Sequence, residues 1–176
     1  MLNRILSVFK RSQNASAKSG EQNYSVSPDQ ADTVAAAFGL ISFQIMMSKE
    51  QFQDEEPPVR SIEDPGLISY WIVGYVTGLL DAATQYRHNR AQFTGEMLNF
   101  MYEVVFTKRH QMAAYGCYAS AVAVKDFPQD PFYPVFKEFD AGMKEGFGLF
   151  FNVLENKPNM RFLQALMNNG LPDNLA

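Results

Sequence analysis

The residues best suited to chemistry are three side chains spaced by seven, Glu96, Glu103 and His110. Seven residues make nearly two turns of an α-helix, so this spacing places the three side chains near one face. Carboxylates combined with an imidazole can bind a metal ion or act as general acid and base in a helical bundle. A bundle-type metalloenzyme built on these three residues is therefore one hypothesis.

Two features of the sequence count against this metal site. Di-iron bundles use Glu-x-x-His on two helices, and the chain contains no Glu-x-x-His. The polar run Thr107–His110 is expected to break or kink a helix, which would separate His110 from Glu96. Asp81 and His88 form a second pair spaced by seven, but this pair is one residue out of step with the first. We predict neither a bound metal nor another cofactor.

Sequence motifs of the common enzyme classes are also missing. The chain has no GxxxxGK[ST], GxGxxG, GxSxG, HExxH or paired CxxC. Its one cysteine, Cys117, lies in an apolar stretch with no histidine and acid placed by sequence to activate it, so we expect a buried structural thiol. Glu138 and Glu145 alternate with lysines and are expected on an exposed face. An enzyme is the less favoured interpretation.

Four glycines indicate which elements must pack together. The stretch 67–83 (LISYWIVGYVTGLLDAA) is the most apolar in the chain and spaces Gly74 and Gly78 one helical turn apart. The same spacing recurs at Gly142 and Gly146. Glycine inside a helix costs about 1 kcal/mol relative to alanine, and close approach of a second helix can offset that cost. We predict that these two helices face one another through their glycines.

The starts of two helices carry capping signals. Asp64-Pro65 places an N-cap residue before a proline at the first helical position, which predicts that the central helix begins there. Its apolar run is shorter than the roughly 20 residues that a bilayer requires and has Asp64 and Asp81 on either side, which disfavours a membrane span. Ser27–Gln30 reads as a capping box that begins a helix extending to about Met47.

Helical periodicity continues through the rest of the chain. It predicts a third helix from about Ala91, a fourth over His110–Val124, a fifth from Pro134 and a short last helix over Met160–Asn169. Strand-like alternation of β-branched residues does not occur. We therefore predict an all-α fold, an antiparallel bundle of five or six helices with a short N-terminal amphipathic helix.

The first 27 residues differ from the rest in composition. Residues 1–12 form a basic amphipathic pattern, residues 13–27 read as a polar linker, and residues 28–176 are expected to form a single helical domain. Three interpretations of residues 1–12 stay open: docking on the domain or a partner, weak contact with an anionic membrane, or the start of a mitochondrial-type transit segment. A secretory signal is excluded because no continuous apolar core follows the basic residues.

Charge and composition restrict the class of partner. A net charge of -4 and a pI near 5.2 argue against nucleic acid, because no overall positive field is available to hold phosphates. With 47% hydrophobic residues the chain is expected to fold. A single cysteine fits a reducing compartment, so we predict a cytoplasmic protein.

Aromatic residues are concentrated near one helix. Six of them are candidates for an interaction surface: Phe132, Phe136, Phe139, Phe147, Phe150 and Phe151. Core packing accounts for most of these rings, and the remainder would form a protein-binding face or the lining of an apolar pocket. The leading hypothesis is a non-enzymatic interaction or assembly module that binds another protein or itself. The alternative is a carrier or sensor for an apolar ligand.

Overall fold

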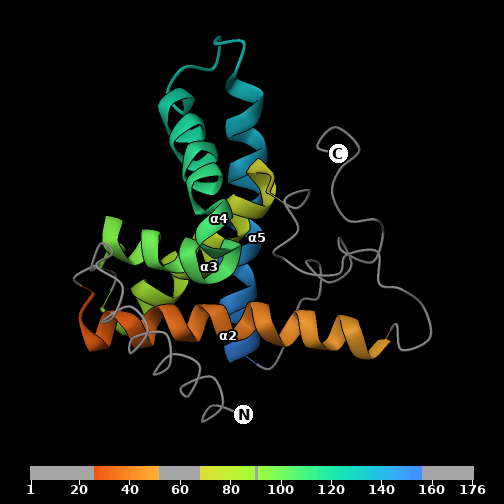
Figure 1. Ribbon diagram of the computed structural model, residues 1–176. Coiled ribbons are helices and arrows are strands. Elements are labelled where there is room, and N and C mark those ends of the chain that lie inside the picture. The colour runs from red at the N-terminus through yellow and green to blue at the C-terminus, as the bar shows by residue number, and fades with distance from the viewer. Residues whose placement is uncertain (1–25, 52–67, 90, 156–176) are drawn as a thin grey trace.

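The computed structural model describes residues 26–51, 68–89 and 91–155 of the 176-residue chain (Figure 1). These residues form four α-helices and no strand: α2 (Pro28–Gln51), α3 (Tyr70–Arg87), α4 (Gly95–Val124) and α5 (Tyr133–Leu154). The predicted all-α class is confirmed for this part of the chain. The predicted helices over residues 1–12 and Met160–Asn169, and most of the predicted linker, lie outside the described residues.

Helix α2 begins at the predicted capping box. The backbone N–H of Gln30 donates to Ser27 Oγ at 3.3 Å, and the backbone N–H of Ser27 donates to Gln30 Oε1 at 2.9 Å. The two side chains thus satisfy backbone donors that have no partner inside the helix. The helix ends at Gln51, four residues beyond the predicted Met47.

Helix α3 starts later than predicted. Residues 68 and 69 are not helical, so a continuous central helix from Asp64 is wrong. Ser69 has an extended backbone, and its Oγ accepts the N–H of Ile72 at 3.1 Å, which makes this serine the N-cap. At the other end Asn89 has a φ of 52°, a left-handed conformation that asparagine tolerates and that commonly terminates a helix.

Helices α3 and α5 cross in direct backbone contact at their glycines. A Cβ atom added to any of these glycines would overlap a backbone carbonyl of the other helix, with the pairs Gly74–Phe139, Gly78–Met143, Gly142–Trp71 and Gly146–Tyr75. Residue numbers increase in the same direction along both helices, so the pair runs parallel. The predicted antiparallel arrangement is wrong for this pair, because α4 lies between the two helices in sequence and returns the chain to the starting end.

Helix α4 is sharply bent. The side-chain amide of Gln111 donates to the backbone carbonyl of Asn99 at 2.8 Å. In a straight helix these residues would be about 18 Å apart along the axis, beyond the reach of a glutamine. The predicted third and fourth helices are therefore two arms of one helix, residues 95–106 and 111–124, and the polar run Thr107–His110 marks the bend. The two arms run in different directions in Figure 1.

The second arm of α4 and helix α5 form an antiparallel hairpin, residues 111–154. The turn between them is closed in part by the N–H of Phe132, which donates to Asp130 Oδ1 at 2.8 Å. The rings of Tyr118 and Phe139 meet across the pair with centroids 5.9 Å apart. The turn end of this hairpin projects away from α2 (Figure 1).

All four helices contribute to one hydrophobic cluster, with Val34, Ile72, Met97 and Phe139 among its members. One buried polar pair lies within it. Thr77 donates to the backbone carbonyl of Val73, and its Oγ1 lies 2.7 Å from the hydroxyl of Tyr102. Burial raises the pKa of Tyr102, so this phenol stays protonated. Because the hydroxyl of Thr77 already donates to Val73, the phenol is the donor to Thr77.

Candidate functional site

His88 links helices α2 and α3 through both of its ring nitrogens. Its Nε2 lies 2.8 Å from Thr33 Oγ1, and its Nδ1 lies 3.3 Å from Asp29 Oδ2. Asp81, the predicted partner of His88, instead accepts a hydrogen bond from Gln85 at 3.0 Å. The actual partners precede His88 by 55 and 59 residues, and sequence spacing contained no signal for them.

An acid, an imidazole and a hydroxyl in this order are also the parts of a hydrolase triad. In this protein the hydroxyl of Thr33 donates to the backbone carbonyl of Asp29 at 2.9 Å, and the residue is fully buried. A nucleophile must be within reach of its substrate, which a fully buried threonine is not. The arrangement is therefore a structural connection between two helices.

The three candidate metal ligands lie apart along α4. Glu96 is exposed in the first turn, where backbone N–H and the Thr94 hydroxyl lower the pKa of its carboxyl group. Glu103 is half-buried on the first arm, and His110 is half-buried at the bend. Within the described ranges, no three His, Cys, Asp or Glu side chains are grouped so that they could hold a metal ion.

Glu138 is not the exposed residue that its lysine neighbours suggested. It is half-buried on α5, and its Oε1 accepts the backbone N–H of Trp71 at 3.1 Å. Trp71 lies in the first turn of α3, so a carboxylate of one helix caps the start of another. Burial raises the pKa of Glu138, and the hydrogen bond from Trp71 opposes this effect.

Cys117 lies near Glu138 on the second arm of α4 and is half-buried. Burial raises the pKa of its thiol, and the negative charge of Glu138 raises it further. A thiol with a raised pKa is a poor nucleophile at neutral pH, because the thiolate is the reactive form. The environment of Cys117 suits a packing role.

The six candidate aromatic residues do not share one environment. Phe139 and Phe150 are buried in the core. Phe136, Phe147 and Phe151 are partly buried and pack against that core, and Phe147 and Phe151 have ring centroids 5.2 Å apart. Phe132 alone among the six is largely exposed, at 69%.

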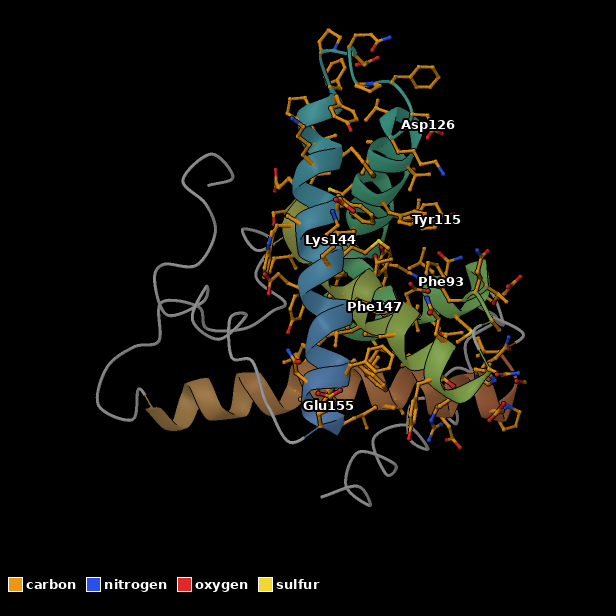
Figure 2. All side chains as sticks on the ribbon, turned by 180° about the vertical axis from the view of Figure 1, so that it is seen from behind. Phe93, Tyr115, Asp126, Lys144, Phe147 and Glu155 are labelled. Carbon is orange, nitrogen blue, oxygen red and sulfur yellow. The ribbon has the colours of Figure 1, made fainter. Side chains whose placement is uncertain are left out.

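Apart from Leu154 at the far end of α5, the hairpin exposes four large apolar side chains, which come from α4, the turn and the residue before α5. These are Met112 (76% exposed), Tyr115 (37%), Phe127 (58%) and Phe132 (69%), and we call them the hairpin surface. Tyr115 projects from the side of α4 that is turned away from α5 (Figure 2). Only Phe132 of this set was a sequence candidate. The signal for Met112 and Tyr115 was a stretch without charged residues, residues 111–124, within the predicted fourth helix.

None of the helices in the described ranges is sufficiently long and apolar to cross a membrane.

Comparisons with protein-family models, with curated proteins and with solved structures found no match to this chain.

Proposed function

We propose that this protein is a non-enzymatic interaction or assembly module of the cytoplasm, and that it binds through the hairpin surface. The observation that carries the proposal is the exposure of Met112, Tyr115, Phe127 and Phe132 on one projecting hairpin. The cores of protein–protein interfaces are enriched in aromatic residues and methionine and depleted in charge. The free thiol of Cys117 supports a reducing compartment.

The composition of α4 strengthens this proposal. An exposed helix face normally carries charged residues, yet residues 111–124 include none although half of them are exposed. A single exposed apolar side chain needs no explanation, whereas an uncharged helix face next to exposed rings favours a binding surface.

Pull-down with the tagged full chain tests the proposal. A double variant, Phe127→Ser with Phe132→Ser, is expected to recover at least tenfold less of the protein that the wild type recovers specifically. Tyr86→Ser is the matched control, because Tyr86 is 59% exposed and lies on α3. Equal recovery by the double variant and the wild type, with both folded by circular dichroism, would contradict a role for the turn.

A further inference from the structure

The C-terminal third of α5 carries an apolar stripe that is only partly buried. Phe147, Phe151 and Leu154 follow one another at intervals of four and three residues, which places them on one face of the helix. Phe147 and Phe151 are half-buried, and Leu154 is 47% exposed. Residues 146–154 contain no charged side chain. We call Phe147, Phe151 and Leu154 the α5 stripe.

Ring contacts extend the α5 stripe toward α3. The rings of Phe147 and Phe151 have centroids 5.2 Å apart, and the buried ring of Phe150 lies 5.7 Å from that of Phe151. Phe150 in turn lies 5.9 Å from Tyr86, which is 59% exposed on α3. Single exposed apolar residues need no explanation, whereas a continuous apolar patch typically marks a contact surface.

The chain itself continues from the end of the α5 stripe. Helix α5 ends at Leu154, and residues 156–176 lie outside the described residues. Their sequence predicts a short helix over Met160–Asn169, which leaves residues 155–159 as the connection. Connections between packed helices are commonly about two to eight residues long, and a short one returns the second helix antiparallel along the first. The predicted helix therefore starts within reach of the stripe.

The apolar residues of this predicted helix have the intervals of the α5 stripe in reverse order. Met160, Leu163 and Met167 follow one another at intervals of three and four residues, the spacing that keeps one side of a helix against a partner. An antiparallel helix reverses the order of its residues along its neighbour, so the two sets of intervals coincide. Three apolar pairs result: Met160 with Leu154, Leu163 with Phe151, and Met167 with Phe147.

Charge favours the same contact. Residues 156–169 carry two positive charges, Lys157 and Arg161, and no acidic residue, while the rest of the chain is acidic. The segment is therefore attracted to the body of the protein. Both positive charges also follow the C-terminal end of α5, where the helix dipole favours positive charge.

We propose that residues 160–169 bind the α5 stripe of the same chain as an antiparallel helix. This contact goes beyond the proposed function, because the stripe lies at the end of α5 opposite the turn that carries Phe127 and Phe132. It gives the chain an internal partner for one apolar surface and leaves the hairpin surface to other proteins.

Dye binding to full-chain variants tests whether the stripe is covered. The double variant Leu163→Asp, Met167→Asp places two carboxylates in the contact, and it is expected to release the segment and raise the fluorescence of the apolar-surface dye ANS at least threefold. Ala165→Asp with Asn169→Asp is the matched control, because it adds the same charge on the opposite side of the predicted helix. With helicity unchanged, equal dye signals from the wild type and the first variant, or an equal rise in both variants, would overturn the proposal.

Cross-linking tests the antiparallel register. In a Cys117→Ala background, Phe147→Cys is combined with Met167→Cys, and a second protein combines Phe147→Cys with Ala165→Cys as its control. With a short bismaleimide, the 147–167 pair is expected to give at least fivefold more product within one chain than the 147–165 pair. Equal yields would overturn the register. A main product that joins two chains would assign the stripe to a second copy and overturn the internal contact.

These experiments are separate from the test of the hairpin surface. None of their variants changes Phe127 or Phe132, so the internal contact can fail while the pull-down result stands, and the reverse.

Discussion

Three polar side chains connect helices that are distant in the sequence. Glu138 accepts from Trp71, Tyr102 donates to Thr77, and His88 bonds to Thr33. The partners are 67, 25 and 55 residues apart. Helical spacing identifies neighbours within one helix only. It therefore paired His88 with Asp81 and predicted that Glu138 is exposed to solvent. These bonds were beyond prediction because they depend on which helices meet.

Replacing Glu138 should change how stability depends on pH. Because burial raises the pKa of Glu138, the folded protein holds this proton more tightly than the unfolded chain does. The free energy of unfolding should therefore fall as pH rises from the ordinary glutamate value of about 4.3 through the higher value in the fold. Glu138→Gln keeps an oxygen for the N–H of Trp71 and removes this decline. Thermal melts between pH 4 and 7 should show the variant gaining stability over the wild type as pH rises.

Asp126→Asn is the control for this experiment, because it removes one negative charge from the exposed turn. The assigned environment of Glu138 would be contradicted if the stability gained by Glu138→Gln over the wild type were constant with pH, or if it grew toward low pH.

At the scale of elements, the crossing of α3 and α5 depends on the absence of side chains. Gly142→Ala would force its methyl group into the backbone carbonyl of Trp71, and a backbone atom cannot rotate away. Overpacking costs typically 1–3 kcal/mol, against a gain of about 1 kcal/mol in helix propensity. Because the neighbouring atoms belong to a backbone, we place the overpacking cost at the upper end of this range, about 3 kcal/mol, and expect a net loss of about 2 kcal/mol in the free energy of unfolding, measured by urea denaturation.

Gly148→Ala is the matched substitution on the same helix. An added Cβ there would meet no atom within 4 Å, so the helix-propensity gain should dominate and the variant should be about 0.5–1 kcal/mol more stable than the wild type. Destabilisation of similar size in both variants would show that helix α5 responds to alanine in general and not to the crossing.

Local patterns predicted several elements well. The capping box predicted the start of α2, Pro134 marked the start of α5, and the polar run at Thr107–His110 marked the bend in α4. Each of these depends on neighbours within a few residues. Glycine spacing also suggested that α3 and α5 meet, but their parallel direction depends on the route of α4. The exposure of Met112 and Tyr115 in the hairpin surface was not predictable, because an uncharged helix can be buried or exposed and only its neighbours in the fold decide.

For the whole molecule, burial is unevenly distributed between centre and hairpin. Helix α3 is buried at almost every position from Ile72 to Thr84, since α2, α4 and α5 all contribute to the cluster around it. The second arm of α4 is covered on one side only, by α5 among the described helices. Regions with fewer buried contacts open at lower free energy than the core. The molecule should therefore open at the second arm before it opens at α3.

Hydrogen exchange followed by mass spectrometry can measure this order. At low protein concentration, amides of residues 72–84 should exchange last, in step with global unfolding, and amides of residues 112–124 should exchange at least tenfold faster. Peptides from the first arm of α4 serve as the internal control, because Met101, Tyr102 and Phe106 are buried there. Exchange in α3 as fast as in the second arm of α4 would contradict the central position assigned to α3.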